Sequence, residues 1–68
     1  MDIVIAAFNH AKSNHGATNE TIWRVMLSGG VKFNGTLTTL GTNMHMITSP
    51  DGRNTYFQAS QVVMLERQ

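Results

Sequence analysis

The sequence predicts a mainly β fold, in which an N-terminal α-helix precedes a five-stranded, strongly bent antiparallel sheet that forms a small open barrel. Three observations predict it: an alanine-rich start, five short stretches of strand composition, and turns rich in glycine or containing proline between them. With 68 residues, the chain is expected to form one domain over residues 1–68, with the helix in 1–15 and the barrel in 21–67.

The N-terminal helix is predicted from a cap, an apolar face and a stop. Asp2 is a residue type that accepts hydrogen bonds from the first free amides of a helix, and Gly16 follows the segment as a C-terminal stop. The apolar positions at helical spacing are Ile3, Ala6, Ala7, Phe8 and Ala11. Residues 3–5 are β-branched, so a strand is the alternative, but the alanines favour a helix that covers one open end of the barrel.

The first two strands are predicted over residues 21–27 and 31–38, with a turn at Gly29 and Gly30 between them. Asn34-Gly35 taken alone is a hairpin signal that competes with the second strand. The turn at residues 28–30 comes only a few residues earlier, however, and apolar and polar residues alternate in phase through Gly35. We therefore expect an uninterrupted strand in which Gly35 marks a sharp bend or a close backbone approach.

Three further strands are predicted over residues 43–48, 54–58 and 61–66. A turn at residues 40–42 precedes the first of them, a Pro-Asp-Gly turn the second, and a tight step at 59–60 the third. In residues 43–48, Met44 and Met46 share one face, and Asn43, His45 and Ile47 share the other. We expect His45 on the wet face, as a residue that faces solvent or a pore.

Composition excludes several classes of function. A net charge of +1 and a charged fraction of 13% are too low for nucleic-acid binding by charge alone. With no cysteine, and with His10, His15 and His45 lacking metal-ligand spacing, we expect no metal and no cofactor. The few carboxylates are scattered, so we do not expect an enzyme. No basic leader or membrane-length apolar run is visible, which indicates a cytoplasmic protein without a membrane contact.

The small size of the chain indicates self-association. A folded chain of this length buries only about 60% of its unfolded surface, and without disulfides oligomerisation is the main remaining source of stability. An open barrel leaves strand edges unpaired, and repeated pairing of the fourth and fifth strands between copies can close a ring. The candidate subunit-interface residues are Tyr56, Val62 and Met64.

The order of three segments resembles the Sm-like family, and its bacterial Hfq branch in particular. Residues 35–47 are similar to the first Sm motif, with its glycine, spaced apolar residues and turn. Residues 30–35 resemble the Gly-Ile-Lys-Leu-Gln-Gly run of Hfq, and residues 56–63 resemble its Tyr-Lys-His-Ala-Ile-Ser-Thr-Val run. The resemblance extends over about residues 21 to 66.

The resemblance implies a homo-oligomeric ring of five to seven subunits that binds single-stranded RNA rich in uridine or adenosine. The candidate RNA-binding residues carried over from it are Asn43, His45, Phe57, Gln58 and Lys32. This chain departs from the pattern at Gly41, where the family has aspartate, at Asn43, which cannot stack on a base, and in the loss of the Lys-His pair. The alternative is therefore a ring that serves as a protein-interaction or assembly module with a degenerate RNA pocket.

Overall fold

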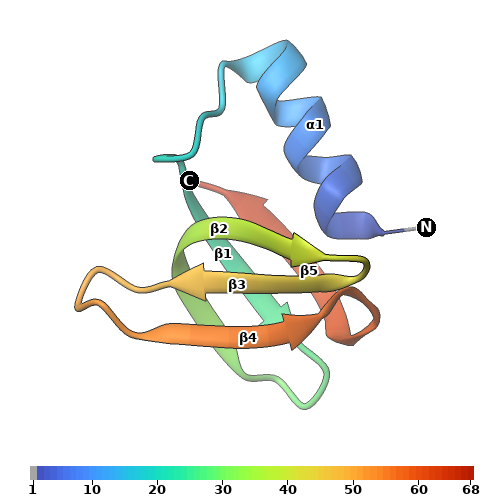
Figure 1. Cartoon of the computed structure of the whole chain (residues 1–68), viewed down its shortest axis with the longest axis vertical. Helices are drawn as coiled ribbons and strands as arrows, with labels where there is room; N and C mark the ends of the chain where they lie inside the picture. Colours follow the sequence, from blue (N-terminus) through green and yellow to red (C-terminus); the bar gives the residue numbers. More distant parts are fainter. Residues whose placement is uncertain (1) are drawn as a thin grey trace.

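The protein, described here by a computed structural model for residues 2–68, consists of one α-helix and a five-stranded antiparallel sheet, as the sequence predicts (Figure 1). The strand order in the sheet is β4-β3-β2-β1-β5. The elements in chain order are α1 (Ile3–His15), β1 (Ile22–Leu27), β2 (Lys32–Gly41), β3 (Met44–Thr48), β4 (Asn54–Gln58), the short 3-10 helix η1 (Ala59–Gln61) and β5 (Val62–Arg67).

The helix begins and ends at the residues that the sequence indicates. The Asp2 side chain accepts hydrogen bonds from the amides of Val4 and Ile5, and Gly16 ends the helix in the left-handed conformation. The predicted apolar face was partly wrong, because Ile3 is 44% exposed and Ala6 is also exposed. A narrower stripe, formed by Val4, Ala7, Phe8 and Ala11, faces the sheet. No helix in residues 2–68 is both long and apolar enough to cross a membrane.

β2 is the longest strand, and it connects the two halves of the sheet. Its first half pairs with β1 and its second half with β3, and Thr36 takes part in both registers. β2 extends to Gly41, so the turn predicted at residues 40–42 lies instead at Thr42 and Asn43. Figure 1 shows that β2 curves strongly between its two pairings.

Gly35 lies at this curve, where the backbones of β2 and β3 approach closely. A Cβ added to Gly35 would overlap the carbonyl oxygen of Thr48 and would lie 2.6 Å from the carbonyl carbon. No side chain fits there without a backbone shift. The sequence-based choice of one bent strand over an Asn-Gly hairpin is therefore confirmed.

The core lies between the curved sheet and the inner face of α1. Its buried residues are Val4, Ala11, Ala17, Trp23, Val25, Leu37, Ile47 and Phe57. α1 thus contributes to the same core as the strands, and it lies over one side of the sheet in Figure 1.

Candidate functional site

The N-terminus of α1, the β2–β3 turn and η1 lie together at one end of the sheet (Figure 1). The amide of Ala59 donates to the carbonyl of Asn43 at 2.9 Å, which ties η1 to the β2–β3 turn. The amide of Ser28 donates to the carbonyl of Gln61 at 2.7 Å, which adds the β1–β2 turn to the group. Four of the five predicted RNA-binding residues belong to this end.

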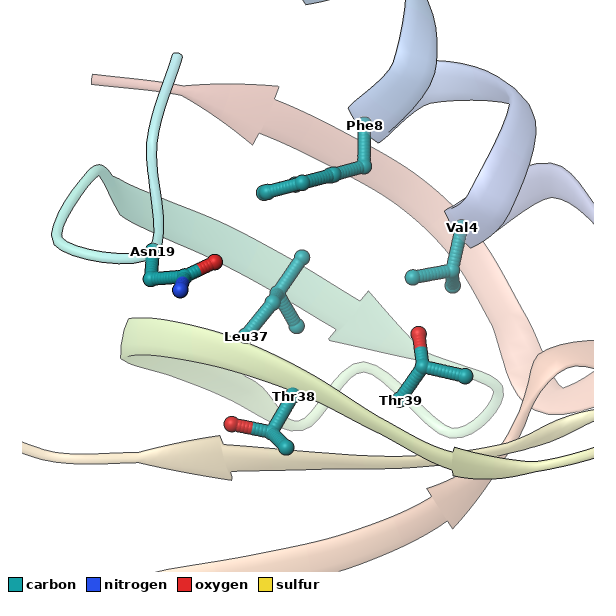
Figure 2. Close-up of a pocket in the computed structure, with 6 residues that line it drawn as sticks. All are labelled: Val4, Phe8, Asn19, Leu37, Thr38 and Thr39. Atoms are coloured by element: carbon teal, nitrogen blue, oxygen red, sulfur yellow. The ribbon is translucent and has the colours of Figure 1, made fainter. Parts of the chain in front are cut away.

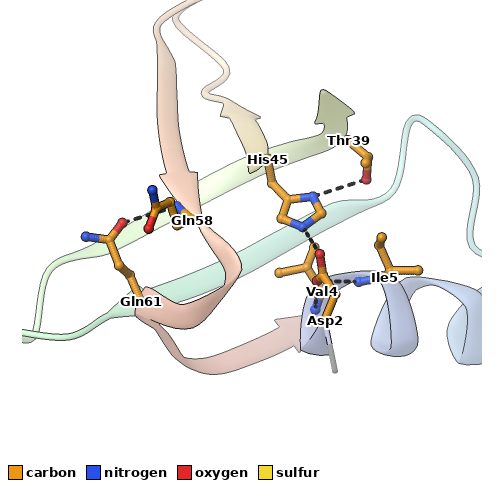
Figure 3. Close-up of polar contacts among 7 residues, drawn as sticks. All are labelled: Asp2, Val4, Ile5, Thr39, His45, Gln58 and Gln61. Atoms are coloured by element: carbon orange, nitrogen blue, oxygen red, sulfur yellow. Dashed lines mark hydrogen bonds and ion pairs between the residues drawn. The ribbon is translucent and has the colours of Figure 1, made fainter. Parts of the chain in front are cut away.

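Asn43 and Gln58 present exposed amide side chains there. Asn43 has a φ of 59°, the left-handed conformation that asparagine tolerates in tight turns. Gln58 is the cross-strand partner of Met44, the residue that follows Asn43. The Gln61 side chain accepts from the Gln58 amide at 3.1 Å and so stabilises the start of η1 (Figure 3). Lys32 is exposed too; it is the first residue of β2, beside the β1–β2 turn and across from Met26 on β1.

The expectation that His45 faces solvent or a pore was wrong, because the structure buries this side chain completely. The predicted alternation holds, since His45 and Ile47 share a face, but that face is the core. His45 Nε2 lies 2.7 Å from Asp2 Oδ2, and Nδ1 lies 3.1 Å from Thr39 Oγ1 (Figure 3). Both ring nitrogens therefore have a polar partner inside the protein, which offsets the cost of burying the imidazole.

Phe57 is also buried, with 2% of its surface exposed. It is the cross-strand partner of His45, and the two ring centroids are 6.0 Å apart. The structure therefore brings the predicted residues together in two layers. Asn43 and Gln58 are exposed, whereas His45 and Phe57 are buried.

The predicted interface residues lie on the two outermost strands. Tyr56 on β4 is 61% exposed, whereas Val62 and Met64 on β5 are half-buried. Val63 on β5, which sequence reasoning did not select, is 60% exposed.

Asp2 is the charged group closest to His45. Partial burial raises the pKa of Asp2, but hydrogen bonds from His45 and from the amides of Ile5 and Val4, with the attraction of the imidazole, outweigh it. The net result is a pKa below the ordinary value of 3.8. The carboxylate is thus held in its charged form.

A carboxylate, an imidazole and a hydroxyl in contact are the residue types of a catalytic triad, in which a hydroxyl nucleophile is activated. The side chains of this set are Asp2, His45 and Thr39. The His45 imidazole has no exposed surface, so a substrate cannot reach it. Thr39 is the direct cross-strand partner of His45 in the β2–β3 ladder. Ordinary sheet pairing therefore accounts for the short distance between Thr39 Oγ1 and His45 Nδ1. This arrangement favours a structural cross-link over catalysis. Residues 2–68 contain no group of three or more metal-ligating side chains close enough to hold an ion.

A pocket of about 340 Å³ lies between α1 and β2 (Figure 2). Its lining residues are Val4, Phe8, Asn19, Leu37, Thr38 and Thr39. None of them is charged, and the three apolar side chains come from the facing surfaces of α1 and β2. The sequence analysis did not predict this pocket. Asn19 lies in a polar segment that was interpreted as a connection, and no local sequence pattern indicates that it lies near Leu37.

In comparisons with known proteins, no protein-family model, no curated protein and no solved structure matches the chain.

Proposed function

We propose that the chain is a ring-forming, Sm-like protein that binds single-stranded RNA and catalyses no reaction. The observation that carries the proposal is the strand order, in which β4 and β5 are the outermost strands and each has one edge without a partner strand in residues 2–68. Free edges are templates for pairing with another chain. Pairing of β4 of one copy with β5 of the next is head-to-tail, and such a contact can close into a ring of five to seven copies.

Exposed apolar side chains on both edge strands support self-association. Tyr56 on β4 and Val63 on β5 are each about 60% exposed, more than most large apolar residues of this chain. Pairing of the two edges would cover surface on both strands. It would also supply stability that a core of this size lacks.

Light scattering at micromolar concentration tests the ring. We expect an oligomer for the natural chain and a smaller species for Tyr56→Lys, because lysine on an edge strand opposes pairing. Leu40→Lys is the matched control: Leu40 is 51% exposed but lies on β2, an interior strand. A stable monomer for the natural chain would remove the ring from the proposal.

The amides of Asn43 and Gln58 are the proposed RNA contacts. A primary amide offers two donors and an acceptor, the groups that pair with the edges of unstacked bases. Both side chains are exposed at the same end of the sheet, and ring symmetry would repeat the pair once per copy. Lys32, the first residue of β2, would contact phosphates beside the β1–β2 turn.

Fluorescence anisotropy with labelled uridine-rich and adenosine-rich oligonucleotides tests RNA binding, at a stated low and a stated moderate salt concentration. We expect Asn43→Ala and Gln58→Ala to weaken binding. Asn9→Ala removes an exposed amide from α1 and should bind as the natural chain does. His45→Ala is unsuitable for this test, because the side chain is buried and its loss would disturb the fold.

The second candidate function is a protein-interaction or assembly module built on the same ring. The burial of His45 and Phe57 favours it, because no aromatic ring of the predicted pocket is then exposed for stacking. Stacking contributes about 1–3 kcal/mol per base, so a pocket without it binds RNA weakly. An assembled ring that binds neither oligonucleotide would establish this second candidate over the first.

A further inference from the structure

Within residues 2–68, α1 is attached to the sheet by an apolar stripe and by the polar contact of its N-cap residue Asp2 with His45. The stripe is formed by Val4, Ala7, Phe8 and Ala11, and only Val4 and Ala11 among them are fully buried. A pocket of about 340 Å³ lies against Val4 and Phe8 between α1 and β2, and Phe8 is only partly buried, so the packing under the helix is incomplete. Because the apolar packing is incomplete, the Asp2–His45 contact contributes a larger part of the free energy that holds α1 on the sheet.

The Asp2 carboxylate uses one oxygen for the helix and the other for the sheet. Asp2 Oδ1 accepts from the amides of Val4 at 2.9 Å and Ile5 at 3.2 Å, which starts the helix. Asp2 Oδ2 lies 2.7 Å from His45 Nε2 on β3, which joins that start to the sheet (Figure 3). The two functions of Asp2 can be separated by substitution, because they use different atoms.

The other end of α1 has a chain conformation suited to a hinge. Gly16 has a φ of 70°, and Ala17 is buried in the core directly after it. The turn that follows is held by its own hydrogen bonds, from the Thr18 amide to Thr21 Oγ1 at 2.8 Å and from the Thr21 amide to the Thr18 carbonyl at 3.2 Å. The Ala17 amide donates to the Ala11 carbonyl of the helix at 3.2 Å, so rotation of α1 about residues 16–17 breaks this bond while the turn and the sheet keep their own hydrogen bonds.

Trp23 lies beneath α1 and is the only tryptophan in the sequence. It is 2% exposed, and its ring centroid lies 5.9 Å from that of Phe8 on the helix. Its indole N–H is buried and has no hydrogen-bond partner among residues 2–68. Access to water would satisfy this donor, which lowers the cost of lifting the helix.

We propose that α1 is a latched lid, which the Asp2–His45 contact holds over Trp23 and Leu37 and which opens about residues 16–17 while the sheet stays folded. The open form uncovers an apolar strip on β1 and β2 and dismantles the pocket, because Val4 and Phe8 form its helix side. The lid is independent of the proposed RNA binding, since it uses none of the exposed amides at Asn43 and Gln58.

Asp2→Ser tests the lid. Serine caps a helix about as well as aspartate, but its side chain is too short to reach His45. The variant therefore removes the latch and keeps the helix start. Asp51→Ser removes an exposed carboxylate from the β3–β4 turn and is the matched control.

Three readouts decide the outcome: Trp23 emission, its quenching by acrylamide, and hydrogen exchange of the strand amides. We expect Asp2→Ser to shift the emission to the red and to raise quenching several-fold, with β1–β3 amides as protected as in the natural chain. Asp51→Ser should match the natural chain in all three. Unchanged Trp23 emission in Asp2→Ser would overturn the proposal, and so would loss of strand protection together with Trp23 exposure, because helix and sheet would then open as one unit.

Discussion

Two aspartates of this chain make a short side-chain contact with a basic residue, and the surroundings of the two contacts differ sharply. Asp2 meets His45, 43 positions away, in a contact of 2.7 Å between side chains that are 11% and 0% exposed. Asp51 meets Arg53, two positions away, at 3.2 Å between side chains that are 57% and 85% exposed. The first contact joins a helix to a sheet, whereas the second lies within one turn.

The pKa of each carboxylate is lowered, but for different reasons. For Asp51 the largest cause is the hydrogen bond from the Arg53 amide, followed by the Arg53 side chain. Its turn is closed by two backbone hydrogen bonds, from the Ser49 amide to the Arg53 carbonyl and from the Gly52 amide to the Ser49 carbonyl, and needs no other part of the fold. For Asp2 the main lowering contribution, from His45, exists only when α1 is docked. A lowered pKa therefore reports tertiary structure at Asp2 and only local structure at Asp51.

Of the substitutions that compare the two contacts, loss of His45 should reduce the free energy of unfolding the most. His45→Ala leaves the Asp2 carboxylate without its partner and opens a cavity beside Phe57, so we expect the free energy of unfolding to fall by about 3 kcal/mol. Arg53→Ala should leave it unchanged, because exposed pairs contribute little. Urea denaturation of both variants checks this, and similar midpoints would contradict it.

Two glycines of β2 differ in the same way, since Gly35 is in close contact with a distant part of the backbone and Gly41 is in open space. Gly35→Ala places a methyl group against the Thr48 carbonyl, and we expect it to reduce the free energy of unfolding by about 2–3 kcal/mol. Gly41→Ala, in the same strand, has open space around the added Cβ and should change stability by less than about 0.5 kcal/mol. Thermal denaturation compares them, and equal melting temperatures would argue against the close approach.

Acid should weaken both contacts, and salt should distinguish them. Each carboxyl has a pKa below 3.8 in the folded protein, so its contribution to stability is present above that pH and is lost as pH falls through the folded value. The causes that lower the pKa of Asp2 are the His45 side chain and the backbone amides of Ile5 and Val4. High salt should weaken the side-chain attraction of Asp51 to Arg53 more than the contact of Asp2 with His45, because exposed charges are screened more strongly. Stability measured against pH for Asp2→Asn and Asp51→Asn, at low and high salt, checks this; equal salt dependence would contradict it.

The smallest expected effect lies at the β2–β3 turn. Asn43→Gly should preserve stability, since glycine adopts a φ of 59° freely, whereas Asn43→Ala should cost about 1 kcal/mol. Denaturation midpoints check the order of the two variants. The reverse order would mean that the Asn43 side chain, not its backbone conformation, stabilises the turn.

The parts of this fold that depend on neighbours in sequence could be predicted. Asp2 and Gly16 bound the helix as expected, residues 54–58 form the fourth strand, and Gly35 lies at a bend. The site was predicted only in part. Alternation placed His45 and Ile47 on one face correctly, but nothing local showed that α1 would cover that face and bring Asp2 to the imidazole.

The position of β5 in the sheet has a consequence for folding kinetics. β5 pairs with β1, so that Trp23 lies opposite Arg67 and Met26 opposite Met64, across about 40 positions of sequence. The hairpins β1–β2, β2–β3 and β3–β4 join near neighbours and can form early, whereas this pairing must first close a long loop. We therefore expect the docking of β5 on β1 to be the slow step, during which the edge of β1 stays open to pairing with other chains.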